Sequence, residues 1–406
     1  MAQKRADPRP VDPQKIVEAI FDADGWTPEG QAERKRLLAE LESLPPLDAA
    51  SVTKWKKTCA KLSAKGPKLE RKSGQQFLWE KPVKRGLYIV GGEDTKPKAL
   101  LIAMHGGGAG AGDAWSAHGE YQPAASKLGW LLISPEVLEK TERGWTDSGT
   151  EEFVMQLVEQ ALRTWKIDPD RVFFSGHSMG GYGTWTLGAH HADRVAALAP
   201  SAGAPTPVSG LSGRYVDVAA GVIPSLRNVP LVIYQSDNDQ NVPPDANRLA
   251  VELLARARER WGGFEFEYWQ VPGRGHDLPP GGMEALLAKV EKRQRNPRPV
   301  RLVWQPALSW KKQFYWLWWE TPKAGTILEA EADKVKNEIR IQGKPATPIE
   351  VLLDERLVDL LKDVIILLNG KEVFRGKPQA TLETLVRTAL SGDEELVFAS
   401  SVRIKP

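Results

Sequence analysis

The stretch DRVFFSGHSMGGYGTWTLG, residues 170–188, decides the fold. Its apolar run at 172–174 has the β-branched and aromatic composition of a buried strand. Gly176 and Gly180 flank Ser178, and a helical stretch follows directly. A serine in G-x-S-x-G at a strand-to-helix bend is typical of a nucleophile elbow, in which a strained turn exposes the hydroxyl. The stretch therefore predicts that Ser178 is a nucleophile, with a tight turn as the alternative.

Outward from this stretch, short β-rich runs alternate with longer helical stretches. The β-rich runs lie at 76–79, 87–90, 99–104, 130–134, 172–175, 195–199, 231–235 and 264–271. The helical stretches lie at 122–128, 151–165, 182–190, 244–261 and 283–292. Such alternation builds βαβ units and a mostly parallel sheet. The first two runs are too close together for a crossover helix, so we expect them to form an antiparallel edge. We therefore predict an α/β fold, with residues 75–295 as the catalytic domain.

Both ends of the chain differ from this pattern. Residues 1–74 are predicted to form an N-terminal helical extension, because their apolar residues recur at three- and four-residue spacing. Its helices are expected at 13–21, 28–44 and 49–64. The basic segment KRQRNPRPVR, 292–301, contains two prolines and separates the central domain from a C-terminal part. This part, 296–406, is β-rich and is predicted to form a small β-sandwich-like domain.

The C-terminal part contains several strand signals and one short helical pattern. Strands are expected at 314–320, 326–331, 338–342, 349–353, 364–368, 372–375 and 396–404, and a helix at 382–390. The Asn369-Gly370 pair between two β runs indicates a type I′ hairpin. The cluster QFYWLWWE, 313–320, is apolar on both faces of a strand. We expect a core strand there, with an exposed stacking platform for sugars as the alternative.

Composition excludes several classes of function. The 406 residues carry a formal net charge of +3, spread along the chain, which gives no basis for nucleic-acid binding. A single cysteine, Cys59, excludes an internal disulfide, and no apolar run reaches the ~20 residues of a membrane span. The start MAQKRADPRP, 1–10, lacks the apolar region of a signal peptide, which leaves a cytoplasmic location or export with the signal removed. No pattern indicates an oligomeric state.

Two motifs that resemble cofactor sites do not fit their templates. In FDADGWTPEG, 21–30, a calcium loop with Gly25 at its sixth position would begin at Ile20 and end at Gln31, and neither is a carboxylate. The glycine-rich ALLIAMHGGGAGAGDAW, 99–115, has no P-loop lysine and no strand with an acidic residue about 20 residues further on. We therefore expect no metal and no cofactor.

The glycine loop after the strand at 99–104 is better explained as part of an oxyanion hole. Glycines allow backbone N–H groups to approach an acyl oxygen closely. Gly107 and the adjacent Gly108 are the candidates for one donor, and the N–H of Met179, just after the serine, is the candidate for the other. Such a donor typically raises the turnover rate by about 10²–10³-fold.

A serine hydroxyl needs a base, and the six histidines can be sorted by position. His276 lies in a Gly-Arg-Gly-His loop after the last predicted strand, from which it can reach Ser178, and His118 is the second choice. The orienting acid is expected at the end of the preceding strand, where Asp239 is preferred. Asp237 is the alternative, although a turn aspartate often bonds nearby backbone. The resulting order of serine, aspartate and histidine is the one expected for this motif on an α/β sheet.

Five further residues are candidates for the walls of a substrate pocket, because they lie in or next to loops expected at one edge of the sheet. They are His105, Trp115, His118, Trp145 and His177. His105 and His177 belong to the two motif loops and are expected to shape them. For Trp145 the alternative is simple packing.

The motifs H-G-G-G, G-H-S-M-G-G, D-x-x-V-P and G-x-G-H, in this order and on these elements, resemble the α/β-hydrolase superfamily. GHSMGGYGTW, with DPDRVFFSG just before it, is similar to polyhydroxybutyrate-depolymerase-like and feruloyl-esterase-like carboxylesterases and to prolyl-oligopeptidase-type catalytic domains. The resemblance covers residues 76–292 and implies the α/β-hydrolase fold, serine hydrolysis and the triad. Prolyl oligopeptidases carry a large β-propeller, and the sequence contains no propeller-sized repeat.

The sequence thus predicts a cofactor-independent serine carboxylic-ester hydrolase that works through Ser178, His276, Asp239 and an acyl-enzyme. Its partner would be a small-molecule or polymeric ester, and no nucleic acid. Three alternatives stay open. The chain is a peptidase, or a depolymerase of polymer or carbohydrate esters that binds its substrate with the C-terminal domain, or a binding protein on a hydrolase scaffold.

Overall fold

The computed structural model describes residues 12–406. The segment 1–10, on which the expectation about a signal peptide depends, lies outside the described residues. The chain forms two compact units, of which one contains residues up to Gly66 together with Gln379–Ser401. The other contains Pro67–Pro378 and Val402–Pro406. The proposed division into three consecutive domains stays a prediction.

The first unit is helical. Its helices are α1 (Pro13–Asp22), α2 (Pro28–Leu41), α3 (Ala49–Ser63) and α9 (Leu382–Ala389). Each begins after an Asp or Thr whose side chain accepts a backbone N–H of the first turn, which satisfies one free donor of the helix end. Apolar side chains from all four helices form one core. The predicted helix at 382–390 is confirmed as α9, and its apolar side chains pack with those of α1, α2 and α3, a partner that periodicity alone does not identify.

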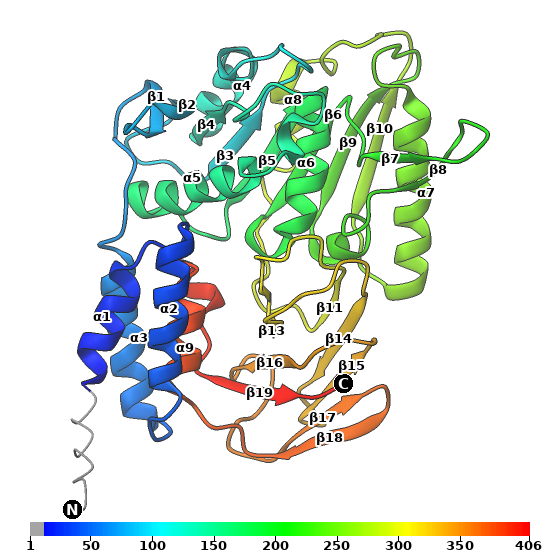
Figure 1. The fold of residues 1–406 in the computed structure, drawn as a ribbon. Coiled ribbons are helices and arrows are strands. Elements are labelled where there is room, and N and C mark those ends of the chain that lie inside the picture. The colour runs from blue at the N-terminus through cyan, green and yellow to red at the C-terminus, as the bar shows by residue number, and fades with distance from the viewer. Residues whose placement is uncertain (1–11) are drawn as a thin grey trace, which may run out of the picture. The chain divides into compact units, whose positions relative to one another are not determined.

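The second unit is built on an eight-stranded sheet with the order β1-β2-β4-β3-β5-β6-β9-β10 (Figure 1). Its strands are β1 (Gly74–Trp79), β2 (Arg85–Gly92), β3 (Leu100–Met104), β4 (Leu131–Pro135), β5 (Val172–His177), β6 (Ala197–Ser201), β9 (Leu231–Ser236) and β10 (Phe266–Val271). β2 is antiparallel to both of its neighbours, and the other pairs are parallel. All eight predicted runs therefore form strands, and the predicted antiparallel edge is confirmed.

Helices cover both faces of this sheet. They are α4 (Ala114–Leu128), α5 (Thr150–Trp165), α6 (Met179–His190), α7 (Pro244–Trp261) and α8 (Gly282–Ala288), with the short 3₁₀ turns η1 (Gly144–Thr146), η2 (Ala192–Arg194) and η3 (Pro224–Asn228). α4 and α8 share one apolar core with alternate residues of the central strands. α5 and α6 pack against the strands from the opposite face (Figure 1). This mostly parallel, two-sided arrangement is the α/β-hydrolase fold.

A short hairpin interrupts the pattern between β6 and β9. Its strands are β7 (Pro207–Ser209) and β8 (Tyr215–Val218), which pair antiparallel. Sequence reasoning missed this hairpin because its strands are only three and four residues long.

Two smaller sheets follow, as the β-rich C-terminal sequence predicted. One has the order β11-β14-β15-β17-β18, and the other has the order β12-β13-β16-β19. Their strands are β11 (Arg301–Trp304), β12 (Gln313–Phe314), β13 (Leu317–Trp318), β14 (Leu328–Asp333), β15 (Glu338–Gln342), β16 (Ile349–Leu353), β17 (Val364–Leu368), β18 (Lys371–Gly376) and β19 (Ser400–Ile404), with η4 at Glu394–Leu396. Asn369 and Gly370 both have positive φ, 51° and 80°, as the predicted type I′ turn requires.

The aromatic cluster at 313–320 is not one strand. Tyr315 has a φ of +50°, and the chain turns there between β12 and β13. The predicted alternation of faces was therefore wrong, since a left-handed residue breaks the period of two. Tyr315, Trp316 and Trp319 are buried, so the core interpretation holds and the sugar-platform alternative does not.

A cluster of buried polar groups joins the segment after β11 to residues at the end of α6 and at the start of α5. Lys311 Nζ lies 2.7 Å from Asp193 Oδ1, and both side chains are almost completely buried. Glu151, at the start of α5, contacts His190 Nδ1 at 2.9 Å and His191 Nε2 at 3.0 Å. Burial lowers the pKa of His191 to about 4, so this ring is neutral at pH 7. The cluster satisfies charges that the second unit would otherwise bury at high cost.

Among residues 12–406, no helix is both long and apolar enough to cross a lipid bilayer.

Replacing Lys311 with alanine is expected to leave the Asp193 carboxylate buried without its counter-charge. The free energy of unfolding should fall by about 3–5 kcal/mol, as for other buried pairs that lose one partner. Lys312→Ala is the matched control, because the neighbouring pair of Lys312 and Glu320 is partly exposed to solvent and contributes at most about 1 kcal/mol. Urea unfolding followed by tryptophan fluorescence measures both variants. Equal small losses in the two variants would contradict the role given to the buried pair.

Candidate active site

Ser178 stands at the bend between β5 and α6, in a strained backbone conformation. Its φ of 57° and ψ of −122° lie outside the regions that L-residues prefer. Two flanking glycines make this bend possible. A Cβ on Gly176 would overlap the backbone of Gly180, and a Cβ on Gly180 would overlap the carbonyl of Met104 at the end of β3. The glycines of the motif are therefore required because larger side chains would not fit at these two positions.

His276 is the histidine that reaches the serine. Its Nε2 lies 2.8 Å from Ser178 Oγ, and its Nδ1 lies 2.8 Å from Asp239 Oδ2. The sequence placed these three residues on separate loops, and the structure brings them into one chain of hydrogen bonds. An ionised Asp239 accepts only, so Nδ1 carries the proton and Nε2 is free to accept from the serine hydroxyl.

The Asp239 carboxylate is buried and held from several sides. Its Oδ1 accepts the backbone N–H groups of Asn241 and Val242, both at 2.9 Å. Its Oδ2 accepts from Gln235 Nε2 at 3.2 Å, in addition to His276. Gln235 was missed by the sequence analysis. Only its place four residues before the aspartate, at the end of β9, could have signalled it.

The loop that carries His276 is held by the four residues S-D-N-D, 236–239, of which Ser236 is the last residue of β9. Each of the four binds one residue of the loop. Ser236 Oγ accepts the N–H of Arg274 at 3.0 Å, Asp237 Oδ1 that of Gly273 at 2.8 Å, and Asn238 Oδ1 that of Gly275 at 2.7 Å. Asp239 then takes the side chain of His276. Asp237, the alternative acid, thus binds loop backbone and does not contact the imidazole.

The glycine loop after β3 approaches the serine through Gly106. A Cβ on Gly106 would lie 3.2 Å from the Cβ of Ser178. The carbonyl of Gly106 accepts from His105 Nδ1 at 2.7 Å. In a trans peptide the N–H of the next residue points the opposite way, so the N–H of Gly107 is directed away from His105. The role of Gly107 as an oxyanion donor stays a prediction.

The other two predicted oxyanion residues have different surroundings. The N–H of Met179 is at the first position of α6, where backbone donors have no partner inside the helix. Gly108 lies further out, where it forms a bridge with Ala111, and a Cβ on it would have Glu142 as its nearest neighbour. The structure therefore places Gly106, which the sequence analysis did not single out, closer to the serine than Gly108.

Three of the predicted pocket residues contact other parts of the fold. Trp145 is 1% exposed, and its indole N–H donates to the carbonyl of His105, so it packs in the core, as in the alternative interpretation. Trp115 is 51% exposed and donates to Gln75 of the edge strand β1. His118 packs edge-on against Trp115 and next to Gly91 of β2, so it is not placed to serve as the second-choice base.

The two motif-loop histidines have structural contacts. His105 is buried, and its Nε2 accepts the N–H of Val137 at 3.2 Å while its Nδ1 binds Gly106. Burial lowers its pKa, which keeps the ring neutral. His177 lies beside His276, with ring centroids 4.9 Å apart.

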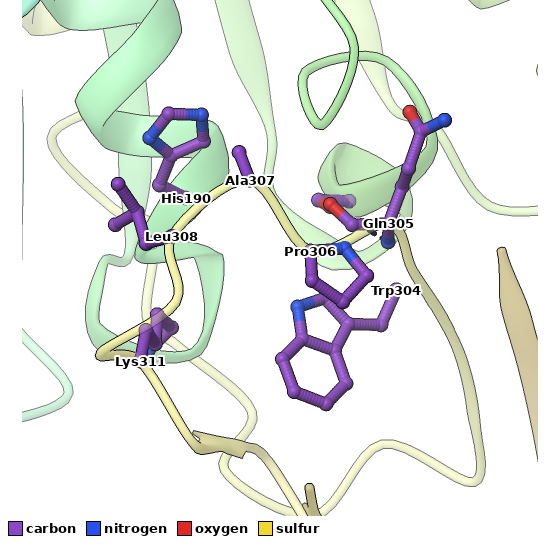
Figure 2. A pocket seen from close by; sticks show the side chains of 8 residues that line it. His190, Trp304, Gln305, Pro306, Ala307, Leu308 and Lys311 are labelled. Atoms are coloured by element: carbon purple, nitrogen blue, oxygen red, sulfur yellow. Dashed lines mark hydrogen bonds between the residues drawn. The ribbon is translucent and has the colours of Figure 1, made fainter. Parts of the chain in front are cut away.

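A small pocket lies at the other end of α6 (Figure 2). It is lined by His190, Ser225, Trp304, Gln305, Pro306, Ala307, Leu308 and Lys311. Ser178 precedes the first residue of the 12-residue α6 and His190 is its last, so about 18 Å of helix separates the two. This pocket is therefore not the site of Ser178. Within residues 12–406, no group of three or more His, Cys, Asp or Glu side chains is arranged to hold a metal ion.

Comparisons with known proteins extend this description. The chain matches no known protein-family profile. It is 25% identical over 227 residues to the bifunctional acetylxylan esterase/xylanase XynS20E of Neocallimastix patriciarum, across 50% of this chain and 33% of that protein. The chain thus spans about a third of the length of this curated relative.

Solved structures with a similar arrangement include the CE1 ferulic acid esterase AmCE1/Fae1A from Anaeromyces mucronatus, at 16% identity over 55% of this chain and 89% of that one, with a TM-score of 0.40. Est1E from Butyrivibrio proteoclasticus is 16% identical over 54% and 97%, with a TM-score of 0.38. TT1662 from Thermus thermophilus is 20% identical over 54% and 99%, with a TM-score of 0.39. The fold itself is established by the order and direction of the strands in the eight-stranded sheet.

Gly180→Ala is expected to prevent the elbow from closing, because the added methyl overlaps the backbone oxygen of Met104, which cannot move without breaking β3. The variant should yield little soluble folded protein. Gly119→Ala on α4 is the matched control, since a Cβ there meets nothing within 4 Å and alanine favours a helix by up to about 1 kcal/mol. Soluble yield and urea unfolding compare the two. A Gly180→Ala protein as stable as the Gly119→Ala protein would contradict the packing argument.

Proposed function

We propose that this chain is a serine hydrolase that cleaves carboxylic esters through an acyl-enzyme. The observation that carries the proposal is the hydrogen-bonded line from Ser178 through His276 to Asp239, with both links at 2.8 Å. Each member lies on the element that the nucleophile-elbow motif requires, in an α/β-hydrolase fold. The curated relative, which aligns over half of this chain, is named as an acetylxylan esterase, and this adds support.

The first half of the reaction forms the acyl-enzyme. His276 Nε2 accepts the hydroxyl proton as Ser178 Oγ attacks the ester carbonyl carbon. The carbonyl oxygen becomes an oxyanion, which the N–H groups of Gly107 and Met179 would stabilise in a site where such donors contribute about 10²–10³ in turnover. When the carbon–oxygen bond to the alcohol breaks, His276 returns the proton to the departing alcohol, and the acyl group stays on Ser178.

The second half repeats this chemistry with water. His276 takes a proton from a water molecule, whose oxygen attacks the acyl carbon. The tetrahedral intermediate then releases the carboxylic acid, and Ser178 regains its proton from His276. Asp239 holds the imidazole in the required tautomer throughout and stabilises its protonated form, without being protonated itself.

The proposal extends to the alcohol portion of the substrate. A carbohydrate ester is the substrate class favoured by the name of the curated relative, an acetylxylan esterase/xylanase. A peptidase and a binding protein on a hydrolase scaffold remain the rivals. The complete triad argues against a pure binding protein, which has no use for a nucleophile and base in contact.

Ser178→Ala and His276→Ala are each expected to lower ester turnover by about 10³-fold or more, since members of a triad act as a unit. Asp239→Asn should lower it by about 10⁴-fold, because the wrong tautomer is then favoured. Hydrolysis of p-nitrophenyl acetate and butyrate, of acetylated xylan and of peptidyl arylamides separates the substrate classes.

Ser126→Ala is the control for this series, because Ser126 is an exposed serine near the end of α4 whose hydroxyl binds Gln122. It should keep wild-type turnover. Ester hydrolysis that survives in Ser178→Ala would exclude the proposed mechanism, and faster cleavage of arylamides than of esters would favour the peptidase.

A further inference from the structure

The side chain next to the nucleophile has no role in the mechanism given above, yet it lies against the base. His177 is the last residue of β5 and directly precedes Ser178. Its ring lies next to the ring of His276, with centroids 4.9 Å apart and planes inclined by 39°. Its Nδ1 lies 2.9 Å from Ser201 Oγ, which fixes the ring from the other side.

Ser201 links this contact to the nucleophile. Its backbone carbonyl accepts the N–H of Ser178 at 2.9 Å, while its side chain binds His177. One residue at the end of β6 therefore fixes both the strained serine and the ring beside the base. Because Ser201 is completely buried and belongs to the central sheet, this support is rigid.

The loop that carries the base needs such support. Gly273 and Gly275 both have positive φ, and a Cβ on either would meet nothing within 4 Å, so this loop is not packed from outside. The anchors from the end of β9 hold the backbone of residues 273–275 only. The side chain of His276 is 18% exposed and is held by Asp239, by Ser178 and by the ring of His177.

The charge of His177 also suits this place. Burial lowers its pKa to about 4, and the charge of His276 acts in the same direction, whereas a hydrogen bond to the backbone of His276 and the charges of Asp239 and Asp277 oppose it. The ring is therefore neutral at pH 7. A neutral ring does not repel the imidazolium that forms on His276 when it accepts the serine proton.

We propose that His177 is a positioning residue for the base. Its ring, tethered to Ser201, covers one face of His276 and keeps Nε2 directed at Ser178 Oγ through the reaction. The inference rests on the proposed function, since it assumes that His276 takes the serine proton. It predicts that turnover, and not substrate binding, depends on the ring.

His177→Ala is expected to lower kcat with p-nitrophenyl butyrate by about 10-fold or more and to change KM less than about threefold, since positioning acts on the transition state. Water that replaces the ring would favour the charged imidazole, so the acid limb of the kcat/KM profile should move to higher pH. His177→Phe restores a ring face but not the hydrogen bond to Ser201, so it should recover kcat only in part. Ser201→Ala removes only the tether and should give an intermediate loss.

Urea unfolding of the same variants separates positioning from a merely structural role. An unchanged kcat and acid limb in His177→Ala would overturn the proposal. The proposal would also be overturned if the Ala and Phe variants lost kcat equally and each loss of kcat matched a loss in the free energy of unfolding. If Ser178→Ala abolishes turnover while His177→Ala does not affect it, only this inference fails. If no ester is hydrolysed by the wild-type chain, the proposed function fails first.

Discussion

The close approach of the elbow to the end of β3 is the constraint on which the rest of the site depends. The strained φ and ψ of Ser178 persist only because the glycines on either side allow β3, β5 and the start of α6 to touch through their backbones. This contact brings Gly106 against Ser178, directly before the first residue of α6. Ser178 and the backbone around it are thus positioned by main-chain packing, which does not depend on side-chain rotamers.

The acid and base are positioned differently, by side chains that bind backbone. The residues S-D-N-D at the end of β9 each hold one residue of the Gly-Arg-Gly-His loop. The amide of Gln235 donates a hydrogen bond to the Asp239 carboxylate. The ring of His177 lies against the ring of His276. Every residue in this arrangement lies at or just after the carboxyl end of β5, β9 or β10, the edge at which open α/β sheets place their ligands.

The sequence predicted what local patterns encode. The strands of the main sheet and the three residues that form the hydrogen-bonded line could be predicted because G-x-S-x-G, D-x-x-V-P and G-x-G-H each lie at the end of a recognisable strand. Contacts between distant segments could not be predicted. Gln235 and Gly106 carry no motif of their own, α9 shows an apolar face without showing its partner, and the turn at Tyr315 requires a left-handed backbone that no propensity indicates. The burial of Trp145, whose indole N–H donates to the carbonyl of His105, could likewise not be predicted, since a loop position does not tell whether a side chain points inward.

The central claim is that the hydroxyl of Ser178 is a nucleophile activated by His276. The most direct test is to treat the protein with a fluorophosphonate and to locate the adduct by peptide mass spectrometry, in the wild type and in His276→Ala. The account predicts one phosphonyl group on Ser178 in the wild type and a labelling rate lower by several orders of magnitude in the variant. Labelling of another residue, or equal labelling of Ser178 in both proteins, would contradict it.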